Sequence, residues 1–186
     1  RELRDFFGVV KTENKRVIAY VDGFNLYFGL REGGMRPYYW LNNHRLAEVL
    51  LRPGQQLVMT KYFTSRISGA RKGDPPDRAM SRNARRKRQS DYLEALTTLT
   101  DFELYFGQFL DKSVRCNACG ATWLSHEEKM TDVQIATEML TDAHADRFDM
   151  ALLVSADSDL VPPIRAVHEL SPGKRIIVAF PPGRSS

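Results

Sequence analysis

The sequence predicts an α/β fold with a mostly parallel sheet that is flanked by helices. The first observation is that short segments rich in β-branched and aromatic residues alternate along the chain with segments of helical periodicity. This order is typical of parallel sheets with helices on both faces. The second is the composition, 42% hydrophobic and 27% charged, which excludes a disordered chain, a collagen and a coiled coil. The third is the length of 186 residues, which suffices for one domain with its own core.

The first half of the chain contains two expected strands. Residues 16–22 read RVIAYVD and end at Gly23, where we expect a turn that leads into a helix. Asn43 is the expected N-cap of a second helix over residues 44–51. The second strand is expected over residues 56–64, before a loop rich in Gly and Pro.

The second half is expected to add three strands and three helices. A long helix is expected over residues 77–99, basic in its first part and with an apolar stripe in its second. Residues 110–127, which include two cysteines, are expected to be irregular. The remaining expected elements are a strand over 102–109, a helix over 129–143, a strand over 149–156, a helix that ends at Leu170 and a strand over 174–180.

The compartment is inferred from what the sequence lacks. No apolar run approaches the ~18 residues needed to cross a bilayer, and residues 1–16 lack the apolar core of a signal peptide. The chain holds only two cysteines, which excludes a disulfide scaffold. We therefore expect a cytoplasmic protein with no membrane partner, and the sequence leaves assembly into a homo-oligomer open.

Acidic residues lie where two apolar strands are expected to end. Asp22 closes the first strand, and Asp157 and Asp159 follow the fourth. A further acid, Asp132, opens the preceding helix. Ligands of open α/β sheets lie beyond the carboxyl ends of the strands, so these carboxylates meet if the first and fourth strands are neighbours. Crowded carboxylates repel one another unless a divalent cation such as Mg²⁺ or Mn²⁺ lies between them. The alternative is that Asp22 only starts a turn and Asp157 only caps a helix.

Three motifs carry a family resemblance: VDGFN at 21–25, EKMTDVQIATEML at 128–140 and LLVSADSDLVPPI at 152–164. In this order they resemble the NYN family, whose domains are similar to PIN nucleases. The resemblance covers roughly residues 16–180 and implies a three-layer PIN-like fold with metal-dependent ribonuclease activity. One departure is Ala156, where Gly is common in the family. By position, the resemblance implies that the catalytic and metal-binding acids are Asp22, Asp132, Asp157 and Asp159, with Asn25 and Ser155 as polar site residues.

The expected function is hydrolysis of RNA phosphodiester bonds by an endoribonuclease with Mg²⁺ or Mn²⁺ as cofactor. The residues themselves do not distinguish endonucleolytic from exonucleolytic cleavage, and the resemblance implies products with a 5′-phosphate and a 3′-hydroxyl. One alternative is a non-catalytic RNA-binding or adaptor module on the same fold. A metal phosphatase is disfavoured because its DxD motif would need an acid where Phe24 stands. A nicotinamide-binding domain is disfavoured because no GxGxxG follows the first strand.

One segment carries the positive charge of the chain. Residues 66–88 hold nine basic residues against Asp74 and Asp77, a net charge of +7, whereas the rest of the chain stands at −3. Such a stripe binds nucleic-acid backbones through counterion release, and the alternative is a solvated helix face. The Tyr-Tyr-Trp run at 38–40 either stacks on unpaired bases or packs in the core. We therefore expect single-stranded RNA as the partner, bound by Arg71, Lys72, Arg82, Arg85, Arg86 and Arg88.

The two cysteines, Cys116 and Cys119, have a CxxC spacing and are followed by a glycine. This pattern is typical of a zinc knuckle, because the glycine lets the backbone turn and direct amides toward the sulfurs. His126 is the natural third ligand, and a distant histidine, Glu127 or water remains open as the fourth. We expect residues 110–128 to form a small insert with structural Zn²⁺. A redox pair and a plain turn with unligated thiols are the alternatives.

Overall fold

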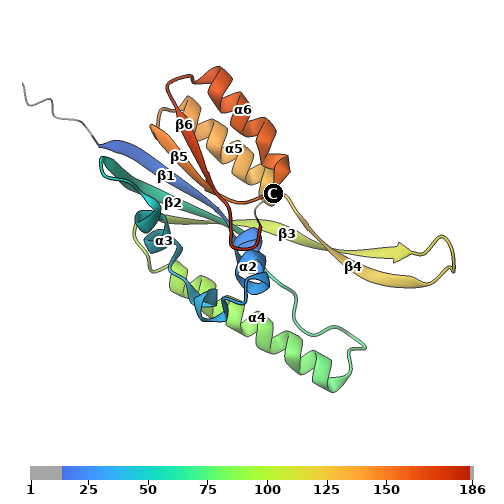
Figure 1. Cartoon of the computed structure of the whole chain (residues 1–186). Coiled ribbons are helices and arrows are strands. Elements are labelled where there is room, and N and C mark those ends of the chain that lie inside the picture. The colour runs from blue at the N-terminus through green and yellow to red at the C-terminus, as the bar shows by residue number, and fades with distance from the viewer. Residues whose placement is uncertain (1–13, 185–186) are drawn as a thin grey trace, which may run out of the picture.

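A six-stranded sheet lies between two layers of helices in the computed structural model (Figure 1), which describes residues 14–184 without the side chains of 109–112 and 123–128. The strand order is β4-β3-β2-β1-β5-β6, and all neighbours are parallel except β3 and β4. This confirms the predicted α/β fold with a mostly parallel sheet. The strands are β1 (Lys15–Asp22), β2 (Gln55–Ser65), β3 (Phe102–Arg115), β4 (Thr122–Lys129), β5 (Met150–Val154) and β6 (Arg175–Ala179).

The helices divide between the two faces of the sheet, with α2, α3 and α4 on one side and α5 and α6 on the other (Figure 1). In β1, Val17, Ala19 and Val21 belong to the first core, whereas Ile18 and Tyr20 belong to the second. A strand that is buried on both faces of a sheet has a continuous apolar sequence, as residues 17–21 of β1 do. The helical elements are α2 (Gly23–Glu32), η1 (Arg36–Trp40), α3 (Asn43–Leu50), α4 (Pro76–Leu96), α5 (Thr131–His144), η2 (Ser158–Leu160) and α6 (Val161–Leu170).

The space beyond the carboxyl ends of β1 and β5, here called the crevice, lies at the topological switch point of the sheet. The chain leaves the carboxyl end of β1 through α2 on one face of the sheet, whereas it leaves the carboxyl end of β5 through η2 and α6 on the opposite face. Neighbouring strands whose connections run to opposite faces form the usual ligand-binding position of an open α/β sheet. The strands expected over residues 16–22 and 149–156 correspond to β1 and β5, and they are parallel neighbours in the sheet.

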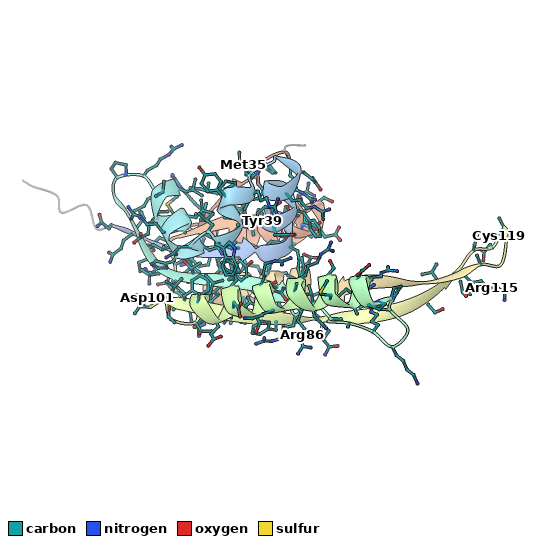
Figure 2. The ribbon with its side chains drawn as sticks, turned by 90° about the horizontal axis from the view of Figure 1, so that it is seen from below. Met35, Tyr39, Arg86, Asp101, Arg115 and Cys119 are labelled. Carbon is teal, nitrogen blue, oxygen red and sulfur yellow. The ribbon has the colours of Figure 1, made fainter. Side chains whose placement is uncertain are left out.

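The prediction that residues 110–127 are irregular was wrong. Strand β3 continues to Arg115, and β4 returns beside it in antiparallel register, with Gln108 opposite Lys129 and Arg115 opposite Thr122. The hairpin projects beyond the helical layers, with Cys119 near its tip (Figure 2). Because the described helices do not extend over the projecting part of the hairpin in Figure 1, its strands need no regular apolar face. The sequence pattern therefore gave no strand signal beyond residue 109.

The start of α3 differs by one residue from the prediction. The N-cap of α3 is Asn42, whose side chain accepts a hydrogen bond from the Arg45 backbone N–H at 2.9 Å, and Asn43 is a buried residue of the helix itself. Two adjacent asparagines made the sequence assignment wrong by one residue.

Within residues 14–184, none of the helices combines the length and apolar character needed to cross a membrane.

A buried ion-pair network joins the sheet to α5. The ammonium of Lys61, on β2, lies 2.7 Å from a carboxylate oxygen of Glu138 and 2.7 Å from one of Asp142. Tyr20 donates a hydrogen bond of 2.6 Å to Asp142, and Arg147 donates one of 2.9 Å. Burial and this bond to Asp142 raise the pKa of Tyr20 far above its ordinary value, so the phenol stays a neutral donor. The network fixes the orientation of the helix that carries Asp132.

Candidate active site

Asp22 lies at the carboxyl end of β1, where it also caps α2. One carboxylate oxygen accepts a hydrogen bond of 3.0 Å from the Asn25 backbone N–H, and the side chain is almost fully buried. The strand can turn directly into the helix because residue 23 is glycine. A Cβ at Gly23 would lie 2.5 Å from the Tyr62 ring and 2.8 Å from the Phe63 carbonyl oxygen. The local sequence thus fixes Asp22 at the crevice.

Ser155 links Asp22 to the turn after β5. Its hydroxyl donates to the second oxygen of Asp22 at 3.0 Å and accepts from the Asp157 backbone N–H at 3.1 Å. A parallel link joins the Asn25 side-chain oxygen to the Ala156 backbone N–H at 3.2 Å. Ala156 is not among the described residues with positive φ, so the methyl group that replaces the family's glycine causes no backbone strain. These bonds hold the two acid-bearing turns together.

Asp132 approaches the same turn from the first turn of α5. Its pKa is raised above the ordinary value, first by burial and then by the negative charges of Asp157 and Asp159. Three carboxylates therefore share one electrostatic environment. Gly107 on β3 allows this approach, because a Cβ there would lie 2.7 Å from the carbonyl oxygen of Lys129, the last residue of β4, and 2.7 Å from the hydroxyl of Thr131, the first residue of α5.

The four predicted metal ligands meet at one crevice, but they do not form a ready-made coordination sphere. Among the described residues, no three His, Cys, Asp or Glu side chains converge closely enough to hold a metal ion. Asp22 accepts from Asn25 and Ser155, and Asp157 accepts from the Asp159 backbone N–H at 2.9 Å. The donor set nevertheless fits a hard cation, because all its ligands are carboxylate oxygens. A cation would also offset the negative charges of Asp157 and Asp159, which together with the larger effect of burial raise the pKa of Asp132. Binding would require the carboxylates to rotate toward one another.

The basic residues of α4 divide between two sides of the helix. Arg82, Arg85 and Arg88 recur at helical spacing and line a pocket together with Arg71, from the loop before the helix. Arg86 lies along the loop, since a Cβ at Gly69 would come within 3.2 Å of its Cδ. Lys72 is exposed on that loop and does not line the pocket. The predicted cluster is therefore not a single surface.

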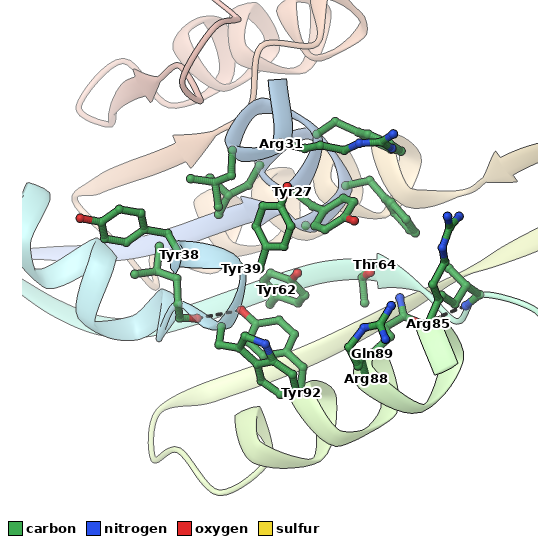
Figure 3. Close-up of a pocket in the computed structure, with 18 of the residues that line it drawn as sticks. Tyr27, Arg31, Tyr38, Tyr39, Tyr62, Thr64, Arg85, Arg88, Gln89 and Tyr92 are labelled. Atoms are coloured by element: carbon green, nitrogen blue, oxygen red, sulfur yellow. Dashed lines mark hydrogen bonds between the residues drawn. The ribbon is translucent and has the colours of Figure 1, made fainter. Parts of the chain in front are cut away.

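The pocket has a volume of about 890 Å³ and lies between α2, η1, the end of β2 and α4 (Figure 3). Gly23 and Phe24 line it, so it begins immediately after Asp22 in the chain. Sequence analysis missed most of its walls, because they come from four separate segments. The sequence feature that could have indicated the pocket is Tyr92, because it continues the helical spacing of Arg85 and Arg88 and therefore lies on the same side of α4. Besides that tyrosine, the aromatic lining residues include Tyr27, Tyr38, Tyr39, Trp40 and Tyr62.

The CxxC turn lies at the tip of the β3–β4 hairpin. Backbone N–H groups of Cys119 and Ala118, together with the Cys119 side chain, hydrogen-bond to Cys116 and lower its pKa. His126 is not brought to this turn. Its backbone pairs with Asp111, five residues before Cys116, which is about 16 Å along the strand. Zinc bonds of about 2.0–2.3 Å do not span that separation within one chain.

Zinc binding at the hairpin tip stays a prediction, now with two ligands from the turn. We expect bound zinc in protein purified without chelator, and its loss in Cys116→Ser and Cys119→Ser, because thiolates are its preferred ligands. The measurement is elemental analysis of each protein. Asn117→Ser, in the same turn, is the matched control and should retain the metal. Absence of zinc from the wild type would leave a plain turn with two thiols.

Comparison with known proteins identifies the family of the chain, a similar curated protein and a solved structure of similar fold. Residues 16–186 match the family model described as the NYN domain. The chain is 29% identical, over 191 residues, to 6-hydroxy-3-succinoylpyridine 3-monooxygenase of Pseudomonas putida, an alignment that covers 84% of this chain and 57% of the relative. A crystal structure of a protein of unknown function from Vibrio parahaemolyticus shares the fold, with a TM-score of 0.57 and 18% identity over 94% of this chain and 86% of that one.

Proposed function

Because the chain belongs to the NYN domain family, we propose that it is a metal-dependent ribonuclease that hydrolyses RNA at the crevice between β1 and β5. The observation that carries the proposal is the pair of hydrogen bonds made by the Ser155 hydroxyl. These bonds join the Asp22 carboxylate to the turn that bears Asp157. The raised pKa of Asp132, caused in part by Asp157 and Asp159, supports a shared cation site.

The proposed cofactor is Mg²⁺ or Mn²⁺. The ligands would be Asp22, Asp132, Asp157 and Asp159, which offer only oxygen atoms. Bound there, the cation supplies Lewis acidity toward a phosphate and makes a coordinated water more acidic.

The other residues of the site position its acids. The Ser155 hydroxyl orients the Asp22 carboxylate, and Asn25 holds the neighbouring turn through the Ala156 backbone. The N-terminus of α5 favours negative charge through its helix dipole, which assists both Asp132 and an incoming phosphate. The RNA backbone would be held by the pocket-facing arginines of α4.

The direct test is incubation of the protein with labelled single-stranded RNA in Mn²⁺ and in EDTA. We expect cleavage only with the metal, because the crowded carboxylates require a cation to approach a phosphate. Metal-independent RNA binding without cleavage would instead support a non-catalytic RNA-binding module on the same fold, which is the main alternative.

The pocket favours a second candidate, the binding of a small aromatic acid. Its walls combine aromatic rings with arginine side chains, and the monooxygenase relative is named for a succinoylpyridine. The chain spans 57% of that relative's length, so we transfer to it neither the oxygenation reaction nor the substrate. Binding of a pyridine carboxylic acid, measured by calorimetry, tests this candidate.

A prediction about salt dependence follows from the orientation of α4. Arg85→Ala with Arg88→Ala should weaken binding to single-stranded RNA and flatten its dependence on log salt by roughly 0.7 per lost contact. Saturating cleavage should change much less, because the acids stay in place. Lys87→Ala is the matched control, since Lys87 pairs with Asp91 at 2.8 Å and does not line the pocket. An unchanged slope in the double variant would mean that this helix face is only solvated.

A further inference from the structure

We propose that the pocket between α2, η1 and α4 binds an unpaired nucleobase of the RNA, with the adjoining phosphates on its arginines. This rests on the proposed function, which it deepens by selecting single-stranded over duplex substrate. The volume of about 890 Å³ lies within the ordinary range for ligand pockets.

Aromatic side chains form one part of the pocket. The rings of Tyr27 and Tyr39 lie with centroids 5.2 Å apart, and that of Tyr92 meets Trp40 edge-on at 5.8 Å. Figure 3 shows Tyr27 and Tyr39 opposite Tyr62 and Tyr92. Trp40 is 54% exposed and Tyr27 is 40% exposed, whereas large aromatic side chains are usually mostly buried. Exposed rings around a hollow offer stacking surfaces that any nucleobase can use.

Asn43, one of the residues that line the pocket, carries an unsatisfied polar atom. Tyr92 donates to the Leu41 carbonyl oxygen at 2.7 Å and accepts from the Asn43 side-chain amide at 2.7 Å. Burial raises the pKa of Tyr92 to about 12, so its hydroxyl remains a donor at neutral pH. The amide oxygen of Asn43, which is 1% exposed, has no hydrogen-bond partner within the described chain. An N–H donor on a ligand would satisfy this acceptor, and nucleobases carry such donors.

Arginines form the remaining part. Arg85 and Arg88 enter from α4 and Arg31 from α2 (Figure 3). All three are exposed, and the structure records no ion pair between them and a described acid. A guanidinium group with no carboxylate partner is available for bidentate bonds to phosphate. The combination of rings and guanidinium groups therefore matches a nucleotide, which joins a planar base to an anion.

The position of the pocket connects it with the proposed cleavage site. Gly23, which follows Asp22, lines the pocket and lies against the Tyr62 ring. A base that stacks there would leave its own phosphate close to the acids. A paired base presents no free face to these rings, because its neighbours in the duplex cover both faces. Unpaired RNA is therefore the substrate that can fill the pocket and reach the acids together.

The test is equilibrium binding in EDTA, so that binding is measured without cleavage. The probes are a fluorescent single-stranded oligoribonucleotide and the same strand in a duplex. We expect Tyr27→Ala and Trp40→Ala to raise the Kd for the single strand roughly five- to hundredfold and to leave duplex binding nearly unchanged. Tyr27→Phe and Trp40→Phe should restore binding, because the ring is retained. Phe180→Ala removes an aromatic side chain that is also 54% exposed but lies outside the pocket, so it should bind as the wild type does.

A second measurement uses the intrinsic fluorescence of the chain, which has two tryptophans, Trp40 and Trp123. Adenosine monophosphate should quench the wild type and not Trp40→Phe. The inference would be overturned if both alanine variants bound RNA as tightly as the wild type does. It would also be overturned if these variants lost affinity for a pyridine carboxylic acid but kept their affinity for RNA. Ring-dependent RNA binding in a protein that cleaves nothing with Mn²⁺ would uphold the inference and contradict the proposed nuclease.

Discussion

Asp22→Asn lowers the rate of Mn²⁺-dependent RNA cleavage by at least about a hundredfold, if the acids act as proposed. Loss of a group that only supports a metal ligand costs 10–100-fold in affinity or activity, and loss of a ligand should cost no less. The fold should persist. Asparagine caps helices as well as aspartate, and its amide can donate to the Ser155 hydroxyl in place of the present bond.

The measurement is single-turnover cleavage of labelled RNA by the wild type, Asp22→Asn and Asp157→Asn. Asp77→Asn, at an exposed position in the first turn of α4, is the matched control and should cleave normally. Full activity in both site variants would remove the basis for the nuclease proposal. Reduced affinity for Mn²⁺ in calorimetry would separate loss of the metal from loss of the RNA.

Asp132→Asn tests the same site through stability. Its raised pKa means that the folded protein holds this proton more tightly than the unfolded chain does, so the group lowers stability as pH rises through the interval between the two pKa values. At neutral pH the asparagine variant should therefore have a Tm equal to or higher than that of the wild type, with cleavage lost. A clear fall in Tm at neutral pH would contradict this account of the crowded carboxylates.

The second large effect is expected at Lys61, in the buried network. Lys61→Met should lower the free energy of unfolding by about 3–5 kcal/mol, because it leaves Glu138 and the fully buried Asp142 without their central cation. The measurement is urea unfolding at neutral pH. Lys87→Met is the control, because its pair with Asp91 is exposed and screened by water, so its loss should change the free energy of unfolding much less.

A double variant identifies the cause of this loss. Lys61→Met combined with Asp142→Asn should recover part of it, because the amide leaves less negative charge buried without a cation. A single variant that unfolds within about 1 kcal/mol of the wild type would show that water reaches these carboxylates.

The sequence predicted those features that depend on local pattern. Asp22 and Asp157 could be assigned to one crevice because each follows an apolar strand, and the order of strands and helices indicates which ends meet. The rotamers of these acids could not be predicted, because Ser155 and the helix caps decide them in three dimensions. The same applies to the pocket. Tyr62 and Tyr92 are ordinary core candidates in sequence, and they line one cavity with Tyr39 only because β2, α4 and η1 come together in three dimensions.

The antiparallel register between β3 and β4 could not be predicted from the sequence either. His126 is ten residues from Cys116 in the chain, close enough to be considered a ligand of the same metal. The antiparallel register of β3 and β4 instead extends the hairpin, so that each further residue moves the two positions apart. A distance that looks short along an irregular loop is long along a strand.

The β3–β4 hairpin places both thiols of the chain at one position, its tip. Its two cysteines are the only ones in the chain, and both belong to the turn at its tip. Figure 2 shows Cys119 away from Tyr39, which lines the pocket. The lowered pKa of Cys116 increases its thiolate fraction at neutral pH, and the thiolate is the form that reacts with maleimides. In metal-free protein, alkylation will therefore attach a dye or a surface tether at this tip. No residue of the crevice or pocket has to be changed, so the native sequence can itself be immobilised for single-molecule measurements.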